Sequence, residues 1–210
     1  MPVTINGTTG IVSPGVDSTN LILDGSTSGS ITMLAPAVAG TNTQTLVAVT
    51  DTLAPVVRGT AVASTSGTSI EFTGIPSWVK RITVMFSGVS TNGASNIQIQ
   101  IGSGSFTTSG YSSCGTAVAA ASATNAATST TGLLVEASGN AAAVRFGNIV
   151  LINVTGNTWN SSSVLSSSPT PISFQGAGGI SLGGTLDRVR ITTVNGTDTF
   201  DAGTINIIYE

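Results

Sequence analysis

Histidine is absent from the 210-residue chain, and cysteine occurs once, as Cys114. Without histidine the chain cannot build a Ser-His-Asp or Cys-His nucleophile system, and a zinc site has few potential ligands. A single cysteine also excludes an intrachain disulfide bond. No basic residue lies near Cys114 in the sequence to activate its thiol, which favours a small buried or incidental residue. We expect no cofactor.

Charge is scarce as well, since charged residues make up 7% of the chain against roughly 25% in an average soluble protein. The six basic residues are spread along the sequence, so we expect no nucleic-acid partner. No apolar run reaches the roughly 18 residues of a spanning helix, and we expect no membrane insertion. Surface charge keeps monomers from associating, and this chain has little of it. The composition therefore favours a protein that assembles with its own copies.

The chain begins Met1-Pro2-Val3-Thr4 and shows neither the basic nor the apolar region of a secretory signal. We therefore expect it to fold in a cytosol. Four Asn-x-Ser/Thr triplets begin at Asn6, Asn153, Asn160 and Asn195. In a cytosol these triplets are not expected to carry glycans.

Aromatic residues are missing from residues 1–57, since the first is Phe72. This segment still carries short β-type runs between turn residues, at 3–5, 10–12, 20–23, 30–34 and 45–49. Short isolated strands need partners in water. We expect an extended N-terminal segment that intertwines with two sister chains into a trimeric β structure and serves for attachment. A flexible linker is the alternative.

Residues 58–210 show the period-two alternation of β-strands. The alternation is clearest at 81–86, 96–101, 188–191 and 205–209, and further strands are expected near 68–73, 131–137, 142–154, 170–175 and 180–186. Turn signals separate the runs, at Asn92-Gly93, Gly139-Asn140, Gly156-Asn157, Gly178-Gly179 and Asn195-Gly196. Together they predict an all-β chain whose C-terminal domain is an antiparallel β-sandwich of jelly-roll or Greek-key type.

One stretch, residues 117–131, does not fit the strand pattern because it is rich in Ala, Ser, Thr and Asn. Alanine favours helix, whereas the interspersed Ser, Thr and Asn disfavour it. We expect a loop here, and a short helix is the alternative.

Paired carboxylates are the remaining route to enzymatic chemistry, because glycoside hydrolases use two acids across a cleft. The candidates are Glu71, Glu136, Asp187, Asp198 and Asp201. Asp198 and Asp201 flank a turn before the last strand, which favours two solvated side chains. A calcium site formed by this pair and backbone carbonyls is the alternative. We expect no catalytic or metal site, and the sequence does not indicate which residues bind a receptor.

The two tryptophans are candidates for core or surface roles. Trp78 follows Pro76-Ser77 at the start of a strand and is expected to anchor the core. Trp159 lies between polar residues, and we expect its ring to cover the end of the sandwich. An exposed loop position, where the ring stacks on sugars, is the alternative for Trp159.

Two segments resemble a β domain found in many phage and prophage structural proteins. Residues 67–82, GTSIEFTGIPSWVKRI, resemble its opening, and residues 186–196 with 200–210 resemble its ending. Residues 3–11 and 29–43 resemble the N-terminal segments of phage fibre-like proteins. The resemblance implies a homotrimeric virion structural protein and provides no catalytic set.

As a tail fibre, the chain would attach to tail or baseplate proteins through residues 1–57. Residues 58–210 would then form a head that recognises a host-surface glycan or protein. Its expected location is the tail of the virion, after assembly in the host cytoplasm. Two alternatives remain: a capsid decoration or head-fibre protein, and a hydrolase of surface polysaccharide.

Overall fold

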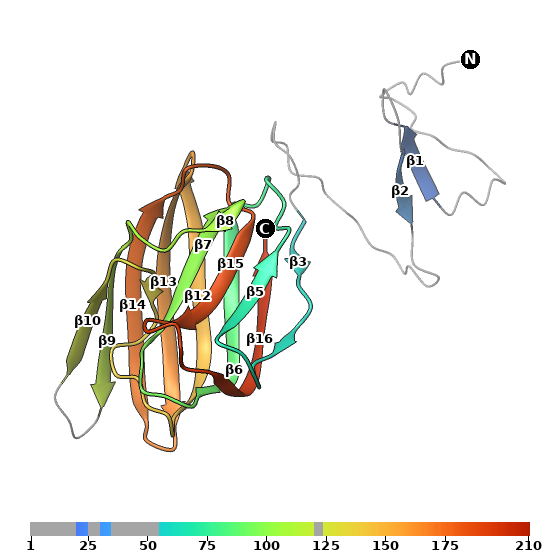
Figure 1. The fold of residues 1–210 in the computed structure, drawn as a ribbon. Helices are drawn as coiled ribbons and strands as arrows, with labels where there is room; N and C mark the ends of the chain where they lie inside the picture. The colour runs from blue at the N-terminus through green and yellow to red at the C-terminus, as the bar shows by residue number, and fades with distance from the viewer. Residues whose placement is uncertain (1–19, 25–29, 35–54, 120–123) are drawn as a thin grey trace, which may run out of the picture. The chain divides into compact units, whose positions relative to one another are not determined.

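The computed structural model describes residues 20–24, 30–34, 55–119 and 124–210 (Figure 1). Every regular element in these ranges is a β-strand, and every strand pairing is antiparallel. The chain divides into two compact units, residues 1–51 and 52–210. The expected all-β, antiparallel class is therefore confirmed for the described residues.

The first unit contains a hairpin of β1 (Asn20–Asp24) and β2 (Ser30–Leu34). Asn20 pairs with Leu34, and Asp24 pairs with Ser30. The strands expected at 20–23 and 30–34 are thus confirmed. The runs at 3–5, 10–12 and 45–49, and the expected intertwining with sister chains, lie outside the described residues.

The second unit contains two sheets. The larger has the strand order β10-β9-β14-β13-β12-β6-β16-β3, with β4 also paired to β16. Its strands are β3 (Val57–Arg58), β4 (Val62–Ala63), β6 (Arg81–Thr91), β9 (Ser112–Ala119), β10 (Asn125–Ser129), β12 (Val144–Thr155), β13 (Thr158–Ser168), β14 (Ile172–Ser181) and β16 (Phe200–Tyr209).

The smaller sheet has the order β11-β7-β15-β5, with β8 paired to β7. Its strands are β5 (Ser69–Thr73), β7 (Ile97–Ser103), β8 (Ser105–Phe106), β11 (Leu133–Leu134) and β15 (Arg188–Thr193). Figure 1 shows β5, β7 and β15 lying across one face of the larger sheet. Asn195-Gly196 and Gly156-Asn157 form turns, as expected.

The core is formed by the apolar side chains that alternate along the strands of both sheets. The larger sheet contributes Ile82, Val84 and Phe86 from β6, and the smaller sheet contributes Ile99 from β7 and Ile191 from β15. Each of these side chains is buried. The alternation expected at 81–86, 96–101 and 188–191 is therefore confirmed, because the residues of each apolar face point between the sheets.

The expected turn at Gly178-Gly179 is wrong, because both glycines lie inside β14. The reason is a close backbone approach by β11 and the residues that follow it. A Cβ on Gly176 would lie 2.2 Å from the Leu134 carbonyl oxygen, and one on Gly115 would lie 2.6 Å from that of Glu136. Inward positions of β14 and β9 therefore hold glycine where alternation would require a large apolar side chain.

The loop expected over 117–131 is also wrong for the described residues. β9 continues to Ala119, and β10 at the sheet edge pairs with it, Asn125 opposite Ala117. Edge strands with one open face need few large side chains, so Ala, Ser and Thr suffice here. The strands expected at 131–137 and 180–186 are much shorter, since β11 has two residues and β14 ends at Ser181.

The structure shows how exposed Trp78, Trp159 and Cys114 are, and this tests what the sequence predicted for each. Trp78 does not anchor the core: it is 39% exposed, and its ring centroid lies 5.9 Å from that of Tyr209. Trp159 lies on β13 and is buried, so the exposed-loop alternative is wrong. Cys114, expected to be small and buried or incidental, is exposed on β9.

Candidate functional site

Charged residues are distributed unequally over the strands, and the exposed charges of the larger sheet lie on β3 (Arg58), β6 (Arg81) and β16 (Asp201). The five neighbouring strands β10, β9, β14, β13 and β12 contain one charged residue, Arg145, whose side chain is buried. The smaller sheet carries Glu71, Arg188 and Arg190, and Asp187 directly precedes β15. The smaller sheet therefore has two arginines and two carboxylates on or beside neighbouring strands.

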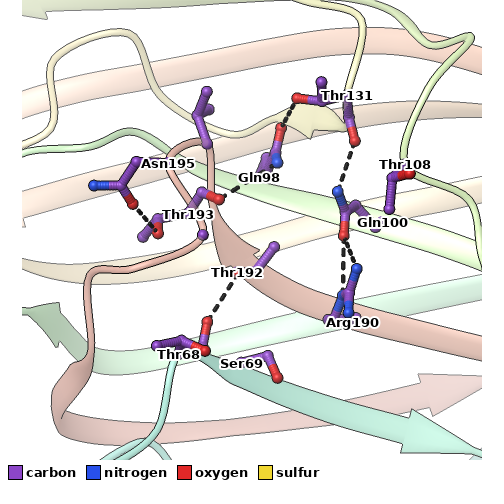
Figure 2. A pocket seen from close by; sticks show the side chains of 12 residues that line it. Thr68, Ser69, Gln98, Gln100, Thr108, Thr131, Arg190, Thr192, Thr193 and Asn195 are labelled. Atoms are coloured by element: carbon purple, nitrogen blue, oxygen red, sulfur yellow. Dashed lines mark hydrogen bonds between the residues drawn. The ribbon is translucent and has the colours of Figure 1, made fainter.

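A groove of about 350 Å³ lies on the smaller sheet, and we call it the polar groove (Figure 2). Its walls come from β5, β7 and β15 and from the segments beside them. The lining residues are Thr68, Ser69, Gln98, Gln100, Thr108, Thr131, Arg190, Thr192, Thr193, Val194, Asn195 and Gly196. Hydroxyl and amide groups dominate this lining, and Arg190 carries its single charge.

Arg190 is held in place on the floor of the polar groove. Its Nε donates to Gln100 Oε1 at 2.9 Å, and Nη2 donates to the same oxygen. The guanidinium carbon lies 4.5 Å from the centroid of the Phe106 ring, a cation–π contact. Gln100 is fixed in turn, because its Nε2 donates to the Thr131 carbonyl at 2.8 Å. Figure 2 shows this chain from Arg190 to Thr131.

Gln98 forms a second fixed amide beside Gln100. Its Nε2 donates to the Thr193 carbonyl at 3.4 Å, and its Oε1 accepts from Ser129 Oγ at 3.2 Å and Thr131 Oγ1 at 3.0 Å. Both amides are nearly fully buried. Buried amides with satisfied hydrogen bonds give the groove a rigid polar floor.

Glu71 lies next to Arg190 on the paired strand β5. Its Oε1 accepts from Ser69 Oγ at 3.2 Å and lies 3.9 Å from Arg190 Nη1. The Glu71 side chain is 42% exposed, so water screens this ion pair and its contribution to stability is small. Glu71 therefore remains free to respond to a ligand at Arg190.

Asp187 and Arg188 form a fork at the start of β15. Arg188 Nε and Nη2 donate to the two carboxylate oxygens at 2.7 and 3.1 Å, and Gly104 N–H donates to both at 3.2 Å. The hydrogen bond from Arg188 holds the pKa of Asp187 below its usual value. The Arg188 guanidinium lies 5.6 Å from the Phe106 ring. Asp187 thus positions an arginine rather than facing a second acid across a cleft.

Tyr111 fixes the segment that leads from β8 past Thr108 to β9. Its hydroxyl accepts from Ile101 N–H at 2.9 Å and lies within donating distance of the carbonyls of Ile101, 3.1 Å, and Thr107, 3.0 Å. Burial raises the pKa of Tyr111 to about 12, with the backbone hydrogen bond from Ile101 and the charge of Arg190 opposing the rise. The phenol is therefore a neutral clamp on this wall of the groove.

Tyr111→Phe is expected to lower the free energy of unfolding by about 1–3 kcal/mol, because the buried Ile101 N–H loses its acceptor. The pKa of Tyr111 in the native protein lies above its pKa in the unfolded chain. The stabilisation that the neutral Tyr111 phenol gives to the fold is therefore complete below about pH 10 and is lost as the pH rises to about 12. Absorbance at alkaline pH checks this. A phenol titrating near pH 12 should be present in the native protein and missing in the variant, and an unchanged titration would contradict the assignment.

Glu136, a candidate catalytic carboxylate, lies away from the polar groove in a buried ion pair. Its Oε2 accepts from Arg145 Nε at 2.6 Å, and the two side chains are 1% and 0% exposed. Its Oε1 accepts from Ile97 N–H at 2.9 Å. Both carboxylate oxygens are thus used by the fold itself.

Asp198 and Asp201 also bond to their own surroundings. Asp198 accepts from Ser95 N–H at 2.9 Å and from Asn195 Nδ2 at 2.6 Å, while Asp201 accepts from Ser90 Oγ. Across residues 55–119 and 124–210, no three His, Cys, Asp or Glu side chains gather into a possible metal site. The structure therefore brings Glu71 and Asp187 to the arginine pair of β15, whereas Glu136, Asp198 and Asp201 lie in separate networks.

The groove residues Gln98, Gln100 and Arg190 are not singled out by the sequence as a site. The alternation of 96–101 places two glutamines on the face opposite the isoleucines, and Arg190 alternates with Val189 and Ile191 in the same way. That pattern predicts only an outward face. In the structure Gln98 and Gln100 are buried on this outward face, which marks them as part of a polar site. Their burial depends on the fold and cannot be read from the alternation alone.

The outer side of β10, β9, β14, β13 and β12 is a second notable surface, which we call the uncharged face. Five large apolar side chains are exposed on it: Val118, Phe146, Ile152, Val154 and Val164. A depression of about 370 Å³ lies among its strands, lined by Cys114, Thr116, Ser162, Ser163, Val164, Gln175, Gly176 and Ala177. This face therefore has the chemistry of a protein contact rather than of an active site.

No helix among the described residues is long and apolar enough to cross a membrane. Comparison with known proteins gives no further guide to the chemistry of either surface. The chain matches no protein-family model, no curated protein and no solved structure.

Proposed function

We propose that the protein is a structural component of a bacteriophage virion, a short homotrimeric tail fibre. Residues 1–57 attach to tail or baseplate proteins, and residues 58–210 form a head that faces the host surface. The observation that carries the proposal is the uncharged face, which suits contact with sister subunits. The resemblance of residues 67–82, 186–196 and 200–210 to phage structural proteins gives the proposal its setting.

The strand register explains why this face suits self-association. Residues paired across neighbouring strands project to the same side of a sheet. One such row crosses six strands without a charge: Ile208, Thr83, Val150, Ser162, Ala177 and Cys114. The next row is Asn206, Met85, Asn148, Val164, Gln175 and Thr116. The rows themselves contain no charge, and the nearest charges are at their border, where Arg58 pairs with Ile208 and Arg81 with Ile152. Burying the rows against another copy therefore desolvates no charge within them, and each exposed apolar side chain favours the contact.

We further propose that the head is a β-sandwich with jelly-roll topology. Its two four-stranded halves are β3/β4-β16-β6-β12 and β5-β15-β7-β11. Along the chain these eight strands change sheet at every step except from β7 to β11, which both lie in the smaller sheet, and eight strands in two such sheets match a jelly roll. β8 to β10 are then an insertion between β7 and β11. β13 and β14 are a second insertion, and both widen the larger sheet that bears the uncharged face.

Val164→Asp tests the face, because Val164 is 62% exposed at its centre. The full-length native protein is expected to scatter light as a trimer, three times the 20.8 kDa chain. In that trimer Cys114 should react slowly with a maleimide, because it lies on the buried side. A buried aspartate is unfavourable, so V164D should raise the labelling rate at least about tenfold.

Val194→Asp is the matched control, since Val194 is also exposed but follows β15 on the smaller sheet. It should change neither the mass nor the labelling rate. A native monomer, or a Cys114 that labels as fast in native protein as in V164D, would refute the trimer contact.

Labelling the intact particle with antibodies for electron microscopy tests the location. A few copies at the tail are expected for a fibre. Many copies over the shell would replace the tail-fibre assignment with a capsid decoration protein.

A further inference from the structure

We propose that the polar groove binds an acidic saccharide, with Arg190 receiving the carboxylate of the ligand. As the receptor site of a fibre the inference rests on the proposed function, whereas the binding itself is a property of the chain alone. The polar groove lies on the smaller sheet, and the proposed subunit contact uses the larger one. Both surfaces can therefore be occupied in one assembly.

The free hydrogen-bonding capacity of Arg190 points to the carboxylate. Nε and Nη2 are engaged by Gln100, while Nη1 makes no hydrogen bond within the described part of the chain. The Arg190 side chain is 24% exposed and lines the polar groove, so a ligand in the groove can contact it. A planar guanidinium with free N–H groups suits a carboxylate oxygen better than a neutral hydroxyl.

The fixed position of Arg190 favours binding further. Phe106 stacks on the guanidinium, Gln100 holds two of its nitrogens, and Thr131 holds Gln100. A side chain that is already ordered loses little conformational entropy when a ligand binds. An exposed arginine without such partners would lose most of that advantage.

The rest of the lining suits the hydroxyl groups of a sugar. Thr68, Ser69, Thr108 and Thr131 bring hydroxyls to the groove, and Asn195 brings an amide. A hydroxyl that already donates one hydrogen bond still accepts another, so these groups can pair with sugar hydroxyls. The volume of about 350 Å³ lies at the small end of ligand sites and holds roughly one or two sugar rings.

Two features disfavour other ligands. The groove lining contains no aromatic ring on which a neutral sugar could stack, and the nearby Phe106 ring is covered by Arg188 and Arg190. One arginine beside Glu71 is also too little positive charge for a nucleic-acid backbone. A sugar ring with one carboxylate matches a lining that has one arginine and several hydroxyl groups.

The test uses the full-length chain with D-glucuronate, D-glucose and acetate, followed by saturation-transfer NMR and titration. Glucuronate is expected to bind at least about tenfold more tightly than either glucose or acetate. Arg190→Ala should weaken glucuronate binding at least about tenfold. Arg81→Ala, which removes an exposed arginine paired with Glu210 elsewhere on the head, should leave the binding unchanged.

Glu71→Gln should strengthen glucuronate binding, whereas R190A should weaken it. A gain of affinity cannot result from misfolding, so this variant keeps the test valid even if R190A folds poorly. E71Q removes the negative charge 3.9 Å from Arg190 Nη1, so glucuronate should bind about two- to fivefold more tightly. Equal binding of glucose and glucuronate, equal binding of acetate, no binding at all, or indifference to both variants would overturn the inference. None of these outcomes depends on oligomeric state, which light scattering reports separately.

Discussion

Replacing Arg145 by methionine is expected to lower the free energy of unfolding by about 3–5 kcal/mol, the usual effect of removing one partner from a buried ion pair. Arg145 is fully buried, and its Nε lies 2.6 Å from Glu136 Oε2. Urea unfolding followed by circular dichroism measures the loss.

The magnitude follows from what the pair connects. Arg145 Nη1 donates to the Ala143 carbonyl at 3.0 Å and Nη2 to that of Asn140 at 3.4 Å. Glu136 accepts from Ile97 N–H at the start of β7. The pair thus ties β12 of the larger sheet to β7 of the smaller sheet and to the 136–143 connection. Methionine leaves the carboxylate buried without its countercharge and the Ala143 carbonyl without its Arg145 donor, while the Asn140 carbonyl keeps the hydrogen bond from Ala143 N–H.

The loss should depend on pH in a defined direction. Burial raises the pKa of Glu136, and the charge and hydrogen bond of Arg145 oppose that rise. Without Arg145 the native pKa moves further above the unfolded value of about 4.3. A raised native pKa favours the fold at pH values below the unfolded pKa and disfavours it as the pH rises. The difference between R145M and native protein should therefore shrink at acid pH.

Two comparisons make this result specific. The double variant Glu136→Leu with Arg145→Met removes both charges and should recover much of the stability, because no unpaired charge is left. Arg81→Met breaks the exposed pair with Glu210, 3.0 Å apart, and should cost less than about 1 kcal/mol. An R145M loss as small as that of R81M would contradict a structural role for the buried pair.

The strands were predictable from the sequence where one face is apolar and the other is polar. In β7 and β15 the inward residues are apolar from Ile97 to Ile101 and from Val189 to Ile191, and the residues between them are polar. β13 and β14 were harder to predict because the crossing of β11 demands glycine inside β14, and Ser163 takes an inward position of β13. The sequence therefore predicted no strand over 158–168, although Trp159 and Leu165 of β13 point into the core.

The candidate site was less predictable than the fold. Glu71 and Asp187 could be named from the sequence as chemically active types, but their partners depend on strand pairing. Arg190 lies opposite both Glu71 of β5 and Gln100 of β7, residues that are 119 and 90 positions away. No local pattern brings these three together, because only the order of the strands in the sheet places them side by side.

Gly203→Ala is expected to destabilise the protein by about 2–5 kcal/mol, through two separate effects. Gly203 has φ +94°, a backbone conformation that costs an L-residue about 1–2 kcal/mol. A Cβ there would also lie 2.4 Å from the Gly88 carbonyl oxygen and 2.7 Å from Val89 Cα. These atoms belong to the backbone of β6 and cannot move aside as a flexible side chain would, so overpacking adds about 1–3 kcal/mol.

Gly74→Ala separates the two effects. Gly74 has φ +73°, and nothing lies within 4 Å of the Cβ that alanine would add. It should lose only the conformational part, about 1 kcal/mol. If chemical denaturation gave equal losses for G203A and G74A, the close contact between β6 and β16 would be absent in solution.

The contact at Gly203 is important because it lies at a bulge that changes which side chains of β6 reach the core. Ala202 pairs with Ser90 and Thr204 with Ser87, so one residue of β16 faces two residues of β6. Before the bulge the even-numbered Val84 and Phe86 point inward, and after it Val89 does. Alanine at 203 pushes against this bulge, and G203A should therefore also loosen Val89. Faster amide hydrogen exchange on both sides of the bulge, over residues 86–91 and 200–205, would report that loosening.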